Sequence, residues 1–163
     1  MKIIPLTQGK VAFVDDEDSE WLSQWKWRAI KSANNLRWYA IRNSKKDDMI
    51  TGKRKCIYMH REIVKGGFQQ RDHKNGNGLD NRKENLRGCT ASQNLGNFRT
   101  FRKGTSKFRG VSWYKDYKKW VVVVNFEKKR YFCGYFDSEV EAAKKYNQKA
   151  FQLFGEFYSP NLV

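Results

Sequence analysis

The stretch RDHKNGNGLDNRKENLRGCTASQN, residues 71–94, decides the fold of the first half of the chain. Its centre is dense in Asn, Gly and Asp, which tolerate left-handed backbone and close tight turns. We therefore expect a loop between two short strands, one ending at His73 and the other formed by LRGCT at 86–90. Thr90 or Ser92 can cap a short helix that opens around Asn94. The predicted local order is strand, loop, strand and helix.

The sequence before this stretch is typical of short strands. The runs KIIPL, KVAFVD, KWRAIK, RWYAIRN and KCIYMHREIV, between residues 2 and 64, alternate apolar and polar residues or are rich in aromatic and β-branched types. Among them, DDEDSEWLSQW at 15–25 has acids where a helix N-terminus favours them. Trp21, Leu22 and Trp25 fall on one helical face, which favours a core role over base stacking.

A second unit is expected after a basic linker. Residues 97–107, NFRTFRKGTSK, carry cations and no apolar period, so we place a linker at 99–106 between domains at 1–98 and 107–163. Beyond it, FRGVSWYKD, KKWVVVVNF and KRYFCGYF predict three strands. A helix follows, with a capping box from Ser138 to Glu141 and a C-terminal Gly155. Its apolar residues at helical spacing are Val140, Ala143, Tyr146, Ala150 and Phe154.

The predicted fold class is therefore α+β: a β-rich N-terminal domain, then a three-stranded antiparallel sheet packed on one helix. With 33 Lys and Arg against 17 Asp and Glu, the chain carries +16 and favours a polyanionic partner. No apolar run approaches the roughly 20 residues that span a membrane. The start MKIIPLTQGK lacks the core of a signal peptide, so a soluble cytoplasmic protein is expected.

Metal chemistry in this chain should rest on oxygen ligands. The cysteines, Cys56, Cys89 and Cys133, form no C-x-x-C pair, and the only histidines are His60 and His73, so no zinc site is expected.

Phosphodiester hydrolysis needs a base for water and a cation for the developing charge. An imidazole that titrates near 6.5 lets His73 serve as that base. Asp72 and an Asn carbonyl are hard oxygen ligands suited to Mg²⁺.

These residues resemble the HNH nucleases, and among them the homing endonucleases of phages and introns. The family pattern is a strand ending in Asp-His, an Asn-rich loop, a second strand and a helix whose first turn carries His or Asn, together a ββα-metal motif. Residues 71–97 follow it nearly throughout, and YMHREIV at 58–64 resembles the strand or helix that precedes the motif in this branch. The final residue, often His, is Asn94 here, as in a recognised subset.

The resemblance implies that His73 is the general base and Asp72 a metal ligand. Asn85 would brace the loop and orient the imidazole, and Asn94 would be the second metal ligand. An amide ligand favours Mg²⁺, with Mn²⁺ as a substitute, over softer ions.

Spacing leaves two alternatives open, because Asn81 competes with Asn85 and Asn97 competes with Asn94. His60 is interpreted as a structural or phosphate-contacting residue. Arg61, Arg82 and Arg87 can hold backbone phosphates, although a solvated face explains them almost as well. The linker cations expected on phosphate are Arg99, Arg102 and Lys103.

Residues 107–161 resemble a second family, the Apetala or ethylene-response-factor DNA-binding domain. Its marks here are RGV at 109–111, KW at 119–120, GYFDSEVEAAKKYNQKA at 134–150 and the closing SPN. Independently, a sheet that carries both cations and aromatic residues suits a β-ribbon in a DNA major groove. The expected contacts are Arg109, Trp113, Tyr114, Lys115, Lys119, Trp120, Arg130 and Phe132.

By the family alignment, Arg109 and Arg130 coincide with groove-contacting arginines. Ser112 and Tyr114 replace arginines and Phe132 replaces a tryptophan, so the base-reading code has changed.

Together these features predict a site-specific, metal-dependent DNA endonuclease of the homing type, with duplex DNA as partner and a monomer slightly favoured. In a phage-encoded protein the location would be the host cell. One alternative is a sequence-specific DNA-binding regulator with an inactive nuclease domain, which predicts damage to Asp72, His73 or Asn94; the sequence carries none. An RNA-binding protein is disfavoured because its aromatic platforms have a different motif.

Overall fold

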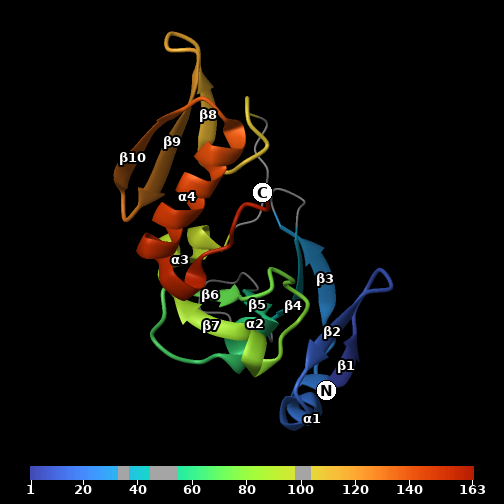
Figure 1. Ribbon diagram of the computed structural model, residues 1–163. Coiled ribbons are helices and arrows are strands. Elements are labelled where there is room, and N and C mark those ends of the chain that lie inside the picture. The colour runs from blue at the N-terminus through green and yellow to red at the C-terminus, as the bar shows by residue number, and fades with distance from the viewer. Residues whose placement is uncertain (33–36, 45–54, 98–103) are drawn as a thin grey trace. The chain divides into compact units, whose positions relative to one another are not determined.

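The computed structural model describes residues 1–32, 37–44, 55–97 and 104–163 (Figure 1). It is a mixed α+β structure with several small antiparallel sheets, as the sequence predicts. The chain divides into two compact units, Met1–Thr90 and Ala91–Val163. The sequence had predicted that the first unit extends to residue 98. Within the described part of the chain, every helix is too short or too polar to cross a membrane.

The N-terminal unit contains three small sheets among its described residues. These pair β1 with β2, β4 with both β3 and β5, and β6 with β7, all antiparallel. The elements are β1 (Lys2–Pro5), β2 (Val11–Val14), α1 (Asp16–Ser23), β3 (Arg28–Lys31), β4 (Trp38–Asn43), β5 (Cys56–Tyr58), α2 (Met59–Ile63), β6 (Gln70–His73), the 3₁₀ helix η2 (Lys83–Asn85) and β7 (Leu86–Cys89).

One element differs in type from its prediction. Residues 55–64 were expected as a strand, but only Cys56–Tyr58 is extended and Met59–Ile63 forms a helical turn. The reason is packing: Met59 is fully buried, and a turn there points it into the core while His60 remains buried as well. A strict alternation would have sent one of these neighbours to solvent.

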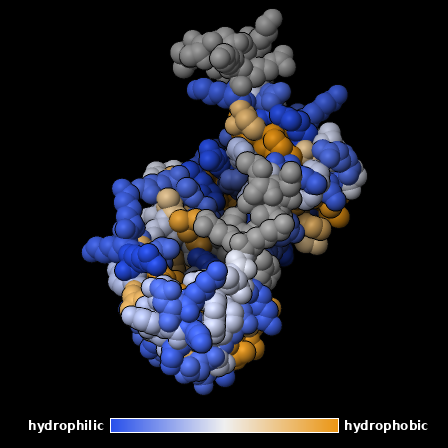
Figure 2. Space-filling model, turned by 90° about the horizontal axis from the view of Figure 1, so that it is seen from above, coloured by the Kyte–Doolittle hydropathy of each residue, from blue (hydrophilic) through white to orange (hydrophobic). Residues whose placement is uncertain are grey.

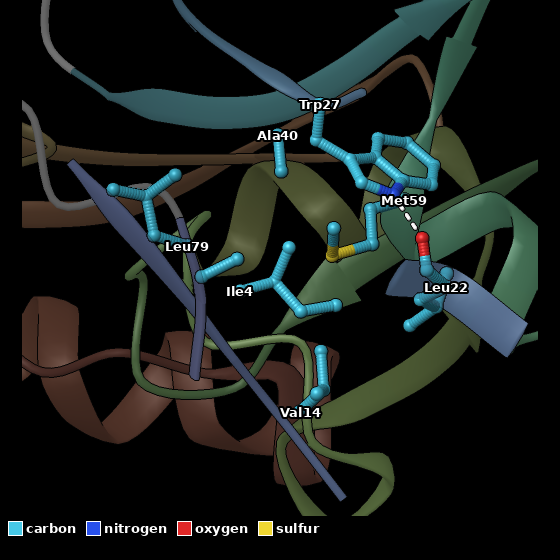
Figure 3. Close-up of a cluster of buried hydrophobic side chains, with 8 residues drawn as sticks. Ile4, Val14, Leu22, Trp27, Ala40, Met59 and Leu79 are labelled. Atoms are coloured by element: carbon cyan, nitrogen blue, oxygen red, sulfur yellow. Dashed lines mark hydrogen bonds between the residues drawn. The ribbon is translucent and has the colours of Figure 1, made fainter. Parts of the chain in front are cut away.

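An apolar core joins β1, β2, α1, β4, α2 and the Asn-rich loop of this unit (Figure 3). Leu22 from α1 is fully buried, and Trp21 and Trp25 pack against the same core, which confirms their predicted role. The Trp27 indole donates a hydrogen bond of 2.8 Å to the Leu22 carbonyl, so its only polar group is satisfied. The remaining buried members are Ile4, Ala12, Val14, Ala40, Met59 and Leu79.

The C-terminal unit is a three-stranded sheet of order β10-β9-β8 with α4 across one face (Figure 1). Its elements are α3 (Ala91–Gly96), β8 (Val111–Tyr114), β9 (Lys119–Phe126), β10 (Lys129–Phe136), α4 (Glu139–Phe154) and the 3₁₀ helix η3 (Gly155–Phe157). Val122 and Val124 of β9 are buried beneath the helix, whereas Val121 and Val123 are only half-buried, as strand alternation requires.

Helix α4 begins and ends as predicted. The Ser138 hydroxyl accepts a hydrogen bond of 3.4 Å from the Glu141 backbone N–H, and Gly155 closes the helix at a φ of 54°. One core prediction is wrong, because Val140 is 43% exposed and Ala142 is buried in its place. Val140 lies about a quarter of a turn from the centre of the buried face.

Helix α3 packs within the C-terminal unit. Gly96 lies against Phe154, so close that an added Cβ would approach the ring to 2.6 Å. The Gly96 carbonyl accepts a hydrogen bond of 3.2 Å from Ser159 N–H, and the Ser92 hydroxyl accepts one of 2.9 Å from Glu127 N–H. These contacts explain why the two units divide before this helix.

Candidate functional site

The Asn-rich loop between β6 and β7 is fixed to the N-terminal core. Its backbone pairs with β2: Phe13 N–H donates to the Leu79 carbonyl at 2.9 Å, and Asn81 N–H donates to the Phe13 carbonyl at 2.8 Å. Gly78 also brings the loop close to β4, because a Cβ there would lie 2.3 Å from the Trp38 carbonyl oxygen. The loop therefore presents its side chains from a rigid support.

Polar side chains inside the loop hold its two ends together. The Asn85 side chain donates to the Asp80 carbonyl at 2.7 Å and accepts from Asn75 N–H at 3.0 Å. Asp80 accepts hydrogen bonds from Asn75 and, in a forked pair at 2.8 Å each, from Arg82. The hydrogen bonds from Arg82 hold the pKa of Asp80 below its ordinary value. Asn85 thus braces the loop, in agreement with one half of its expected role.

The imidazole contact comes from Asn81, the competing asparagine. Asn81 is fully buried, and its Oδ1 lies 3.3 Å from Nε2 of His73, at the end of β6. The Asn81 Nδ2 donates to the Leu79 carbonyl at 3.2 Å, so Oδ1 is the atom that faces the ring. An amide oxygen only accepts, which places the imidazole proton on Nε2 and the lone pair on Nδ1.

The environment of His73 keeps its imidazole neutral near pH 7. The residue is 4% exposed, and burial lowers its pKa below the ordinary value of 6.5. The hydrogen bond with Asn81 and the charges of Asp72 and Asp80 oppose that shift, while Arg37 adds to it. A neutral imidazole has a lone pair with which to accept a proton, the state that a general base requires.

Asp72 precedes His73 on β6 and is paired across the ribbon. Its side chain is fully buried, and Oδ2 accepts hydrogen bonds from Arg87 Nε at 3.0 Å and Arg87 Nη2 at 2.8 Å. Arg87 lies directly opposite Asp72 in the β6–β7 register. The pair was missed in the sequence, although counting residues back from the loop on both strands would have matched the two positions.

His60 of α2 forms one wall beside His73. The two rings are 5.0 Å apart in an edge-on arrangement, and Tyr39 contacts both histidines at centroid distances of 5.8–5.9 Å. Burial, with smaller contributions from His73, Arg61 and Arg71, lowers the pKa of His60 to about 3. His60 is thus a buried neutral packing residue, which favours the structural half of its interpretation.

Asn94 and Asn97 lie in the other unit. Asn94 is half-buried on α3, and Asn97, directly after that helix, is buried. Within the described residues, no group of three or more His, Cys, Asp or Glu side chains is arranged to hold a metal. A cation at Asp72 would therefore need amide, water or phosphate oxygens as its further ligands, the set that Mg²⁺ accepts.

The arginines proposed for phosphate contact differ in their surroundings. Arg61 is exposed on α2, with its guanidinium 5.2 Å from the Tyr58 ring centre. Arg82 is engaged with Asp80, and Arg87 with Asp72, so both act within the loop and ribbon. The predicted contacts Arg99, Arg102 and Lys103 lie outside the described residues.

In the C-terminal unit the two faces of the sheet differ. Pairing places Tyr114, Lys119, Arg130 and Phe132 on the face opposite α4, in line with Val121 and Val123. Lys115 is exposed in the turn after β8. By contrast, Trp113 and Trp120 pair with each other in line with the buried Val122, on the face that α4 covers. The two tryptophans pack edge-on with their ring centres 5.1 Å apart.

Arg109 is engaged inside the unit and does not extend from the sheet. Its Nη1 donates to the Gly96 carbonyl at 2.8 Å and its Nη2 to the Leu95 carbonyl at 2.6 Å, at the C-terminal end of α3. The guanidinium also lies 5.8 Å from the ring centres of Tyr146 and Phe154. A cation at a helix C-terminus satisfies carbonyls that lack helical partners, so these contacts indicate a structural role.

Comparisons with protein-family models, with curated proteins and with solved structures found no match to this chain.

Proposed function

We propose that the chain is a metal-dependent endonuclease that hydrolyses phosphodiester bonds of double-stranded DNA at specific sites, with His73 as general base. The observation that supports this most is the pairing of His73 Nε2 with the Asn81 amide beside the buried carboxylate of Asp72. A structural histidine needs only packing. An imidazole held in one tautomer by a fixed loop, with a lowered pKa, is suited to accept a proton.

In the proposed reaction, Nδ1 of His73 accepts the proton of a water molecule that attacks the scissile phosphorus. The phosphorus–oxygen bond to the leaving strand breaks, and the departing oxygen takes a proton from solvent water. The Nε2–H group remains hydrogen-bonded to Asn81 Oδ1 throughout, so the amide dipole stabilises the positive charge that forms on the ring. Asp72, one residue away, adds a favourable negative charge in the same step, since its charge raises the pKa of His73. Asn85 keeps the loop closed through Asp80 and Asn75.

The residues fit a hard divalent cation, Mg²⁺ with Mn²⁺ as a substitute, because the donors are carboxylate and amide oxygens. Asp72, which is buried and held by Arg87, is the carboxylate that we expect to hold the ion. Asn94 lies on α3 in the other unit, so its role as the second ligand is supported by the sequence pattern alone. The bound ion would neutralise charge on the phosphate.

The second candidate function is a sequence-specific DNA-binding regulator whose N-terminal unit does not cut. It is favoured by the Asp72–Arg87 pair, because a fully buried, doubly hydrogen-bonded carboxylate can be purely structural. In both candidates the net charge of +16 favours a nucleic acid. The contacts expected on the face of the C-terminal sheet opposite α4 would then position the protein on duplex DNA.

The test is cleavage of a supercoiled plasmid library that carries random inserts, with Mg²⁺ and with EDTA. We expect Mg²⁺-dependent nicks or breaks at a shared sequence, found by mapping the new DNA ends. His73→Ala should abolish them, and Asp72→Asn and Asn94→Ala should raise the Mg²⁺ concentration that is needed.

The matched control is Lys74→Ala, which alters the exposed neighbour of His73 and should leave cleavage unchanged. Sequence-specific retention of DNA without metal-dependent cleavage would contradict the nuclease and support the regulator.

A further inference from the structure

The outer face of the C-terminal sheet, the one opposite α4, has an unusual composition for a surface. Phe132 is 58% exposed, and Tyr114 and Tyr135 are each more than a third exposed. Their rings form a continuous layer: Tyr135 lies 5.1 Å from Phe132 and 5.7 Å from Tyr114, and Tyr117 of the adjoining turn is 5.0 Å from Tyr135. The other strand side chains of this outer face are Ser112, Lys119, Val121, Val123, Asn125 and Arg130.

Charge is distributed around this layer and is sparse within it. Arg130 stands at one end, opposite Asn125 in the register, and Lys119 at the other end pairs with Asp137 at 3.1 Å. The turns that flank the strands add exposed lysines. These are Lys115, Lys118 and Lys128. An apolar centre with a cationic rim is complementary to the base edges and flanking phosphates of a DNA groove.

The side-chain types at the centre limit which bases they can read. Guanine is read by Arg or Lys and cytosine by Asp or Glu, whereas adenine is read by Asn or Gln and the thymine methyl by apolar contact. The central strand positions of the outer face carry no carboxylate, and the nearby Asp116 lies in the turn after β8. Phe132, Val121 and Val123 offer only apolar or ring surface, and Tyr135 adds a single hydroxyl to its ring.

We infer that the outer face of this sheet recognises A·T-rich duplex DNA in the major groove, with its aromatic and valine side chains on thymine methyl groups and Asn125 on adenine. Arg130, beside Asn125, would contact phosphate or a single guanine at the edge of the site. The inference rests on the proposed function, because it takes duplex DNA as the partner, and it adds the class of sequence that is read.

The experiment uses the full chain in EDTA, so that binding is measured without cleavage. Binding sites are selected from a random duplex pool, and the affinity for the selected duplex is compared with that for the same duplex with deoxyuridine in place of thymidine. The exchange removes only the methyl groups and keeps base pairing. We expect an A·T-rich central segment and a loss of roughly fourfold in affinity for each methyl group that becomes buried.

Variants then assign the effect to this face. Phe132→Ala and Tyr135→Ala should bring the thymidine-to-deoxyuridine affinity ratio toward one. Phe151→Ala should preserve the ratio, because Phe151 is an equally exposed aromatic residue on α4. If a thermal melt shows that an alanine variant is unfolded, Phe132→Leu replaces it as the test. Phe132→Leu should keep part of the thymidine preference.

Three results would overturn the inference: a G·C-rich selected segment, binding without sequence preference, or equal affinity for thymidine and deoxyuridine duplexes. These outcomes are separable from the proposed function. A protein that cuts plasmid in a His73-dependent manner but shows one of them is a nuclease with another specificity. A protein that prefers thymidine but never cuts fits the regulator.

Discussion

The buried pair of histidines predicts that acid destabilises the N-terminal unit, and His60 allows that effect to be measured. Burial lowers the pKa of His60 to about 3, whereas in the unfolded chain it titrates near 6.5. Between these two values the unfolded state binds a proton that the folded state does not. The free energy of unfolding therefore falls as the pH falls below 6.5, and the contribution is fully present above it.

The magnitude follows from the width of the pH interval. A histidine that stays neutral in the folded state lowers the free energy of unfolding by about 1.36 kcal/mol per pH unit below 6.5. From pH 6.5 to pH 5 this amounts to roughly 2 kcal/mol. His73, whose pKa is also lowered by burial, adds a loss of the same sign. His60→Phe keeps an aromatic ring beside Tyr39 and Tyr58 but removes the titration.

The assay is urea unfolding at pH 7 and pH 5, followed by tryptophan fluorescence, since Trp21, Trp25, Trp27 and Trp38 all lie in this unit. We expect the wild type to lose about 2 kcal/mol more between the two pH values than His60→Phe does. Equal losses in both proteins would refute the reasoning. So would a histidine proton resonance of His60 that titrates near pH 6.5 in the folded protein.

Three further changes test the packing that supports the site and the sheet. Gly78→Ala should lower the free energy of unfolding by about 1–3 kcal/mol, because the added methyl meets the Trp38 carbonyl; Gly67→Ala, where nothing lies within 4 Å, should change it little in the same urea titration. Arg109→Ala should cost about 2–4 kcal/mol through the two carbonyls it leaves unpaired at the end of α3, measured by thermal unfolding, and Arg109→Lys should restore only part of the loss. Ser138→Ala should cost about 1 kcal/mol by removing the N-cap of α4, and a thermal midpoint equal to that of the wild type would contradict the capping contact.

The sequence predicts most strands and the long helix because their patterns are local. Alternation fixes β9, where Val122 and Val124 are buried, and the capping box fixes the start of α4 at Ser138. The helical turn at Met59 could not be predicted from alternation. It depends on core space that only the tertiary structure defines, since two successive buried residues fit neither face of a strand.

The sequence predicted which residues form the candidate site better than it predicted the contacts between them. Asp72 and His73 stand out by their types and by the Asn-rich loop that follows. Which asparagine meets the imidazole depends on how that loop crosses β2, and the bridge from Phe13 to Leu79 and Asn81 joins positions too distant in sequence for a spacing argument. Arg109 was predicted as a DNA contact, and its contacts with the α3 carbonyls could not be predicted for the same reason.

Stability and the protonation state of His73 are coupled in this unit. The backbone bridge that carries Leu79 into the core also buries the Asn81 amide and, with it, His73. Burial keeps the imidazole neutral near pH 7, and the Asn81 oxygen fixes where its proton lies. A substitution that loosened the loop would let water reach the ring and raise its pKa toward the ordinary value. The free energy of unfolding would then depend less on pH, while the imidazole lost its single tautomer. The acid sensitivity of the unit is thus the thermodynamic counterpart of an imidazole held neutral, the state that the proposed general base requires.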